Sequence, residues 1–157
     1  MAAGLTWYFA YGSNMSAGRL FVDRLALEGV AAGQRICGRL DGWRLTFDKS
    51  ARVTGTGAGN IVPAAGEAVF GTLNLLPPKG LEVLDRWEGV AEGHYERRNV
   101  PLIRTDTGAT VEAVTYVALK VAAGLRPTRA YLAFLLAGGD VLPADYLERL
   151  RATPTAD

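Results

Sequence analysis

The chain has 157 residues, a length that favours one domain with a hydrophobic core of its own. The net charge is only +1, from 17 Lys and Arg against 16 Asp and Glu, so the chain lacks the basic field typical of nucleic-acid and anionic-membrane binders. The single cysteine, Cys37, and the single histidine, His94, exclude an internal disulfide and the usual zinc sites.

The start of the chain does not look like a signal peptide, because its first basic residue is Arg19. No apolar run approaches the roughly 20 residues that a membrane-spanning helix needs. We therefore expect one cytoplasmic domain over residues 1–157, with neither nucleic acid nor membrane as a partner.

The N-terminal segment is predicted to be a strand, a turn and a helix. Thr6–Ala10 is β-branched and aromatic, as strands are, and the turn residues Tyr11–Asn14 end it. Ser16 is a suitable N-cap for a helix that reaches about Glu28, with Gly29 as its stop.

Glycine and proline divide the middle of the chain into short strands. Asp41-Gly42, a dipeptide suited to a tight hairpin, separates strands expected at 30–40 and 43–48. The glycine-rich segment Gly55–Asn60 is interpreted as a loop. Further strands are expected at 60–62, 66–75, 95–104 and 109–119.

Three more helices are expected in the second half of the chain, at about 78–87, 128–137 and 143–152. Together with the first helix, they make four helices around about six to seven strands that are mostly joined by hairpins. This pattern predicts an α+β fold, with the strands in a small, mixed, mostly antiparallel β-barrel.

Glu88 is the first candidate for a chemical role. It lies on the same helical face as Leu81 and Leu84, so its carboxyl group points toward the expected core. Burial raises a carboxyl pKa by more than the negative end of a helix does, and a buried glutamate is a candidate general base. On this pattern alone, a frayed last turn that leaves Glu88 in solvent is the simpler interpretation.

The turn after the first strand is the second candidate. In YFAYGSN (Tyr8–Asn14), the strand runs into a turn whose successive backbone N–H groups form a concave site for anionic oxygens. Gly12 permits a close approach of the backbone. Ser13 is a poor nucleophile candidate because the chain has no G-x-S-x-G motif around it. A plain strand-to-helix turn explains the same residues.

These two segments resemble the γ-glutamylcyclotransferase family. The resemblance covers nearly the whole chain, from about Tyr8 to Leu150. It rests on four matches in family order: YFAYGSNM (Tyr8–Met15), NIVP (Asn60–Pro63), LDRWEGV (Leu84–Val90) followed by Gly93-His94-Tyr95, and RPTRAY (Arg126–Tyr131). Four matches in order are far more specific than one tetrapeptide. The turn YGSNM is nearest to the branch that acts on γ-glutamyl-amino acids.

The resemblance implies an enzyme that needs no cofactor, metal or protein nucleophile. The α-amine of a γ-glutamyl group would attack its own γ-carbonyl, releasing 5-oxoproline and an amino acid or amine, a step in the metabolism of glutathione and other γ-glutamyl peptides. By family position, Glu88 would be the catalytic acid and base. The substrate-binding residues would be Tyr8, Phe9, Ala10, Tyr11, Gly12, Ser13, Tyr95 and Tyr131.

Alternatives stay open at this level. The substrate can be a γ-glutamyl-amine or a γ-glutamyl-protected biosynthetic intermediate, or the domain can be a non-catalytic module that binds a small molecule. The apolar helix Tyr131–Ala137 is compatible with a homodimer.

Overall fold

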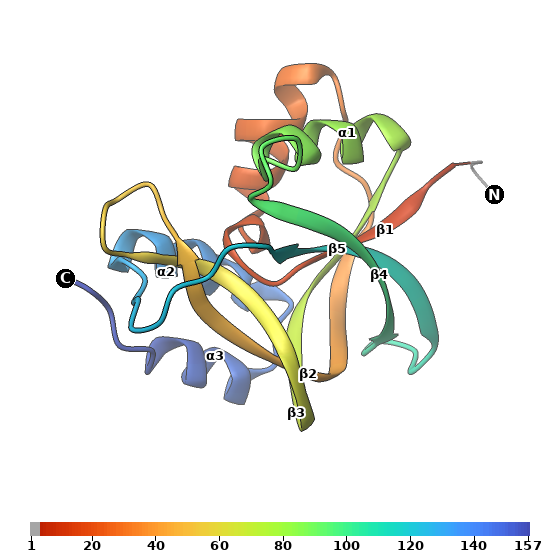
Figure 1. The fold of residues 1–157 in the computed structure, drawn as a ribbon. Helices are drawn as coiled ribbons and strands as arrows, with labels where there is room; N and C mark the ends of the chain where they lie inside the picture. Colours follow the sequence, from red (N-terminus) through yellow and green to blue (C-terminus); the bar gives the residue numbers. More distant parts are fainter. Residues whose placement is uncertain (1–3) are drawn as a thin grey trace.

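A closed barrel of five strands forms the body of the molecule in the computed structural model, which describes residues 4–157 (Figure 1). The strands are β1 (Thr6–Ala10), β2 (Arg35–Ser50), β3 (Gly57–Leu76), β4 (Tyr95–Arg104) and β5 (Thr110–Ala118). Their order around the barrel is β1-β3-β2-β4-β5. Only β1 and β5 pair in parallel, so the expected mixed, mostly antiparallel barrel of an α+β fold is confirmed.

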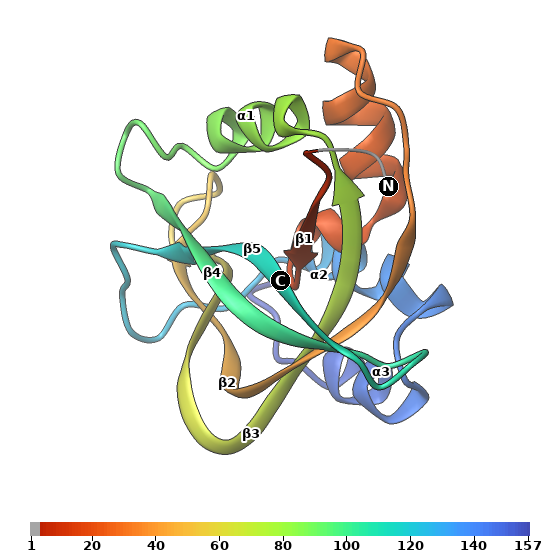
Figure 2. The ribbon, with the colours of Figure 1, turned by 90° about the vertical axis from the view of Figure 1, so that its right-hand side faces the viewer.

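The expected number of strands was too high, because two pairs of predicted strands are continuous. The hairpin expected at Asp41-Gly42 is wrong: β2 runs through this dipeptide, and its register against β3 shifts there. Gly42 on β2 and Gly66 on β3 have φ angles of +83° and +81°. Such left-handed glycines allow bulges that bend paired strands without ending them. In Figure 2, β2 and β3 therefore curve together around the barrel.

The glycine-rich segment Gly55–Asn60 was predicted to be a loop, but most of it belongs to a strand. Residues 57–60 begin β3, and the turn between β2 and β3 lies before them. A Cβ atom at Gly57 would lie 1.8 Å from the carbonyl oxygen of Phe47, and one at Gly59 would lie 3.1 Å from the hydroxyl of Tyr131. Glycine is required at Gly57 because another backbone passes too close for a side chain.

Two hydrophobic clusters form the core. One takes residues from all five strands, including Phe9 and Leu73, and fills the barrel. The other lies between the barrel and the helices and contains Tyr8, Leu84 and Leu135. Successive residues of β1 contribute to different clusters because side chains alternate across a strand.

All four expected helical regions are present. They are η1 (Ser13–Met15), η2 (Gly18–Leu25) and η3 (Ala26–Glu28), then α1 (Pro78–Trp87), α2 (Arg129–Leu136) with η4 (Ala137–Asp140), and α3 (Ala144–Arg151). The first region differs from a regular α-helix, because η2 is a π-helix between two 3₁₀ turns. Leu20 and Leu25 of η2 are buried, whereas Leu27 of η3 is 72% exposed.

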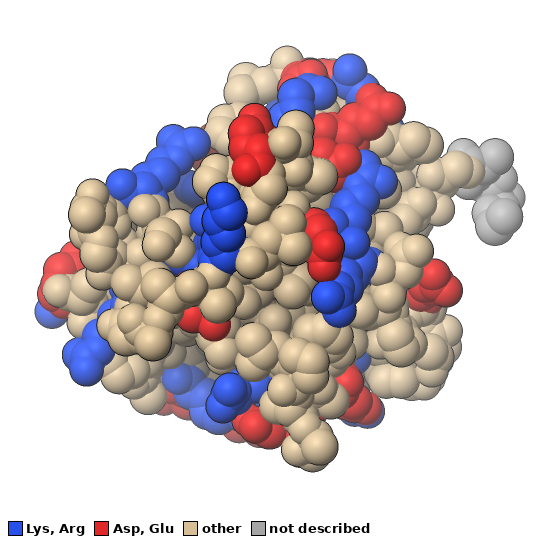
Figure 3. All heavy atoms as spheres, in the orientation of Figure 1, with Lys and Arg blue, Asp and Glu red and all other residues tan. Residues whose placement is uncertain are grey.

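Charge is spread over the surface rather than gathered in one field. On the face drawn in Figure 3, acidic and basic side chains are interspersed. In the part of the chain that the structure describes, no helix combines the length and the apolar character needed to cross a bilayer.

Candidate active site

Helix α1 carries Glu88 at its C-terminal end. Leu81 and Leu84 are buried, and Glu82 and Arg86 on the opposite face are exposed, so the predicted orientation of this helix is confirmed. Glu88 directly follows the last helical residue, Trp87, and its backbone N–H still donates to the carbonyl oxygen of Leu84 (2.8 Å).

The end of α1 is held by hydrogen bonds instead of frayed. Gly89 has a φ of +66°, and its N–H donates to the Arg86 carbonyl oxygen at 3.2 Å. The N–H of Val90 donates to the Asp85 carbonyl oxygen at 3.0 Å. These two bonds around a left-handed glycine make a Schellman motif, which ends a helix sharply. The motif holds Glu88 toward the pocket, whereas a frayed turn would release it into solvent.

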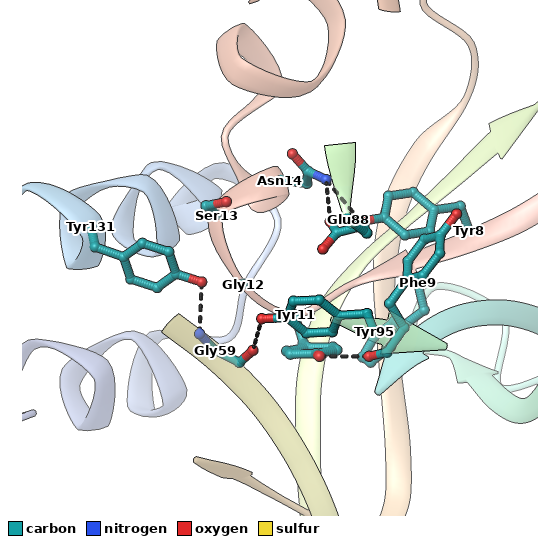
Figure 4. Close-up of a pocket in the computed structure, with 11 residues that line it drawn as sticks. Tyr8, Phe9, Tyr11, Gly12, Ser13, Asn14, Gly59, Glu88, Tyr95 and Tyr131 are labelled. Carbon is teal, nitrogen blue, oxygen red and sulfur yellow. Dashed lines mark hydrogen bonds between the residues drawn. The ribbon is translucent and has the colours of Figure 1, made fainter. Parts of the chain in front are cut away.

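Asn14 lies between Glu88 and Tyr8 (Figure 4). Its Nδ2 atom donates to the Tyr8 hydroxyl at 3.0 Å and approaches Oε1 of Glu88 at 3.5 Å. Nη1 of Arg24 donates to Oδ1 of Asn14 at 2.9 Å. Because a guanidinium only donates hydrogen bonds, Arg24 determines which end of the amide is the oxygen. The amide N–H₂ group of Asn14 is therefore turned toward Glu88 and Tyr8.

The carboxyl group of Glu88 is enclosed, although the residue as a whole keeps partial solvent exposure. Burial raises its pKa to about 7, and the positive charges of Arg24 and Arg19 oppose this rise. Near neutral pH the carboxyl group thus exchanges easily between its protonated and ionised forms, as a general acid and base must.

Two tyrosine hydroxyls hold the opposite wall of the pocket through Gly59. The N–H of Gly59 donates to the hydroxyl of Tyr131 at 2.8 Å, and the hydroxyl of Tyr95 donates to the Gly59 carbonyl oxygen at 2.7 Å. Figure 4 shows Tyr131 reaching Gly59 from α2. The side chain of Thr128 caps α2 by accepting from the N–H of Tyr131 at 3.0 Å.

The tyrosines of the site are neutral. Burial is the main cause that raises the pKa of Tyr8, Tyr11, Tyr95 and Tyr131, and the nearby carboxylate of Glu88 raises all four further. Protonated hydroxyls are available as hydrogen-bond donors across the physiological pH range. The hydroxyl of Tyr11 donates to the carbonyl oxygen of Tyr116 at 2.6 Å.

These residues surround an inner pocket of about 40 Å³. It brings Glu88 together with seven of the eight expected binding residues: Tyr8, Phe9, Tyr11, Gly12, Ser13, Tyr95 and Tyr131. The exception is Ala10, which does not line this pocket. Its short side chain is 2% exposed and packs in the cluster between barrel and helices, and its role in substrate binding stays a prediction.

Sequence reasoning missed four residues of this site: Asn14, Arg24, Gly59 and Tyr116. Asn14 and Gly59 stand inside segments that the sequence analysis singled out. Arg24 had a visible signal, because a charged residue at the helical spacing of Leu20 is unusual on a buried face. Tyr116 had none, since a tyrosine in a strand is ordinary.

A second cavity of about 650 Å³, the outer cavity, adjoins the inner pocket. The two share Ser13, Glu88, Tyr95 and Tyr131 in their linings. Glu88 thus lies where the two spaces meet. Nowhere in residues 4–157 do three His, Cys, Asp or Glu side chains gather as a metal site would require.

Comparisons with known proteins agree with this architecture. Residues 68–150 match the model of the AIG2-like family. A solved gamma-glutamyl cyclotransferase has a TM-score of 0.85 and 24% identity, over 98% of this chain and 90% of that chain. The structure of an uncharacterized protein from Homo sapiens has a TM-score of 0.85 and 25% identity, again over 98% of this chain and 90% of that chain.

More distant structures retain the fold. A yeast gamma-glutamyl cyclotransferase specific to glutathione has a TM-score of 0.61 and 12% identity, and 94% of each chain is covered. No curated protein matches the sequence. Since the family model covers more than half of the chain, the chain belongs to the AIG2-like family, and its fold is that of the gamma-glutamyl cyclotransferases.

Proposed function

We propose that the chain is a γ-glutamylcyclotransferase that uses Glu88 as its acid and base. One observation carries the proposal: the carboxyl group of Glu88 is enclosed beside the turn after β1, and its pKa is raised to about 7. A structural carboxylate in a core is normally paired with a cation, whereas no ion pair within residues 4–157 includes Glu88, and its carboxyl group contacts the neutral amide of Asn14 at 3.5 Å.

The reaction joins two groups of one substrate. The α-amine nitrogen attacks the γ-carbonyl carbon, a new carbon–nitrogen bond closes the five-membered ring, and the original amide bond breaks. Nucleophile and electrophile are already tethered, so holding the substrate in its bent conformer supplies much of the acceleration. Neither a covalent intermediate with the protein nor an external co-reactant is needed.

Glu88 would move one proton between two nitrogens. The substrate ammonium first loses one proton to solvent, which makes the amine nucleophilic. As the carbon–nitrogen bond forms, the ionised form of Glu88 takes a second proton from the attacking nitrogen, which leaves the ring N–H of 5-oxoproline. The protonated form then gives a proton to the departing nitrogen, and the carboxylate is regenerated. A pKa of about 7 suits both steps, because each form of Glu88 is then populated near neutral pH.

The γ-carbonyl oxygen becomes negative during the attack and needs hydrogen-bond donors. We assign this role, or binding of the α-carboxylate, to the backbone N–H groups of the turn at Tyr11, Gly12 and Ser13. Tyr8 and Phe9 would form the side of the pocket. The hydroxyls of Tyr95 and Tyr131 already hold Gly59, which supports a role in positioning the wall against which the substrate lies.

The test compares Glu88→Gln with Glu82→Gln, which removes an exposed carboxylate from the far face of the same helix. Release of 5-oxoproline from γ-glutamyl-amino acids is followed by mass spectrometry. Glu88→Gln should lower kcat by about 10²–10⁴-fold, the range of general acid–base catalysis, and Glu82→Gln should leave it unchanged. Circular dichroism checks that both variants fold. Comparable turnover in Glu88→Gln and the unmodified chain would refute the assignment.

A further inference from the structure

The outer cavity contains more positive charge than its own acidic residues balance. Its basic side chains are Arg19, Arg24, Lys49, Arg52 and Arg86, and its acidic ones are Glu88 and Glu92. Two of the basic groups have partners, since Arg86 is paired with Glu28 and Arg24 donates to Asn14. Within residues 4–157, no carboxylate forms an ion pair with the remaining three: Arg19, Lys49 and Arg52.

Lys49 is the most unusual of the three, because it is only 7% exposed. Its Nζ atom lies 3.2 Å from Nδ1 of His94, an acceptor without negative charge. An ammonium has three N–H donors, and burying its charge without an anion costs free energy. Lys49 lines the outer cavity, where a negatively charged ligand would meet this need.

Arg19 gives an independent indication. Its guanidinium lies 4.2 Å above the ring of Phe134, and its Nε atom is buried without a hydrogen-bond partner in the described chain. Burial and the positive charges of Arg24 and Arg52 lower the pKa of Arg19, and Tyr131 and Asp23 oppose them. The guanidiniums of Arg24 and Arg52 are therefore close enough to Arg19 to repel its charge, and an anion beside Arg19 would relieve this repulsion.

We propose that Lys49, Arg19 and Arg52, here called the cation site, bind carboxylates on the leaving amine of the substrate. The proposal rests on the proposed function and names its substrate class. With the γ-glutamyl group beside Glu88, the leaving amine points into the outer cavity, since Glu88 lies where the two spaces meet. Three unpaired cations favour a leaving amine with two carboxylates over one with a single carboxylate, and disfavour an uncharged amine.

Three substrates of nearly the same shape test this preference. The leaving amine carries two carboxylates in γ-glutamyl-glutamate and one in γ-glutamyl-glutamine. It carries none in γ-glutamyl-glutaminamide, in which the α-carboxylate of the glutamine residue is replaced by a carboxamide. We expect kcat/KM to fall about tenfold with each carboxylate removed, as for one charge-assisted hydrogen bond of about 1.4 kcal/mol. The loss should be mainly in KM, and added salt should reduce it.

Two variants assign the preference to the cation site. Lys49→Met removes the buried charge, and Arg52→Gln removes one from an exposed position whose substitution threatens the fold less. Each should bring the three kcat/KM values closer together. Lys120→Gln is the control, because it removes an exposed lysine that lines neither cavity and should preserve the charge preference.

The outcomes separate the two proposals. Equal kcat/KM values for the three substrates would overturn the cation site and leave the proposed function standing. A preference that persists unchanged in both Lys49→Met and Arg52→Gln would overturn the cation site in the same way. Absence of 5-oxoproline from all three substrates with the unmodified chain would instead overturn the proposed function, and the cation site with it.

Discussion

The inner pocket and the outer cavity treat charge in opposite ways. The inner pocket holds one carboxyl group, that of Glu88, among neutral hydroxyls and an amide, and burial raises its pKa to about 7. The outer cavity holds four cations without a carboxylate partner in the described chain, namely Arg24, which donates to the neutral amide of Asn14, and the three of the cation site. A neutral enclosure suits a group that must gain and lose a proton, whereas unpaired charge suits the selection of a ligand of opposite sign.

The largest expected effect is the loss of activity at acidic pH, which depends on Glu88 in the inner pocket. Protonation of Glu88 removes the base, so kcat/KM should fall about tenfold per pH unit below a midpoint near pH 7. The loss should reach about a hundredfold at pH 5. The measurement is the rate of 5-oxoproline release between pH 5 and 9 at constant ionic strength. A profile that stays flat down to pH 5 would contradict a buried base.

The burial of Glu88 should also make the free energy of unfolding depend on pH. The carboxyl group of Glu88 has a pKa of 4.5 without the protein environment and about 7 in the folded chain. Because the folded state binds this proton more tightly, its stability falls as pH rises from 4.5 to 7. Glu88→Gln removes this cost and should stabilise the fold by about 2 kcal/mol more at pH 8 than at pH 4.

Urea unfolding of Glu88→Gln and Glu82→Gln at both pH values measures this difference. The expected difference of about 2 kcal/mol is smaller than the free energy that corresponds to the whole pKa shift, because Glu88 keeps partial contact with solvent. An equal gain at both pH values would mean that Glu88 is not buried in its ionised form.

Gly89 lines the outer cavity, where it follows Glu88 at the end of α1 and its backbone lies against His94. A Cβ atom at Gly89 would lie 2.6 Å from Cδ2 of His94, and φ is +66°. Gly93→Ala is a matched control, with a φ of +76° but nothing within 4 Å of the added atom. The left-handed backbone conformation should destabilise both Gly89→Ala and Gly93→Ala by about 1 kcal/mol. Gly89→Ala should lose more stability than Gly93→Ala, because its added Cβ atom also collides with His94. Equal melting temperatures for the two variants would show that His94 moves aside freely.

The smallest expected effect belongs to Arg24. Its charge lowers the pKa of Glu88, but less than burial raises it. Arg24→Gln should therefore move the acid midpoint of the activity profile to higher pH, and Arg24→Lys should restore part of the shift. Arg98→Gln, which removes an exposed arginine from β4, is the control. A midpoint shift in the control as large as in Arg24→Gln would point to net charge instead of a local contact.

Local patterns predicted the elements whose boundaries depend on neighbouring residues. The strand Thr6–Ala10 and the strand Tyr95–Arg104 have the expected bounds. The burial of Leu81 and Leu84 followed from helical spacing. Such features arise within one turn or one strand, where propensity and side-chain periodicity decide.

Predictions failed where distant residues decide. Asp41-Gly42 has the local signature of a hairpin, yet pairing with β3 continues on both sides of it, and the hydrogen bonds of the ladder outweigh the turn preference. The glycines of residues 57–59 looked flexible from their neighbours alone. Glycine is needed at Gly57 and Gly59 because Phe47 and Tyr131 pass close to them, and these residues come near only in the folded chain.

The sequence by itself determined the fold class, the helix that carries Glu88 and most of the pocket-lining residues, because these follow from short-range spacing and from motifs matched in order. Only the tertiary structure decided that Asn14 and Arg24 face Glu88, and that three unpaired cations gather in the space beside it. Those contacts join segments up to 74 residues apart, as between Asn14 and Glu88, and no local pattern records which side chains a closed barrel brings together.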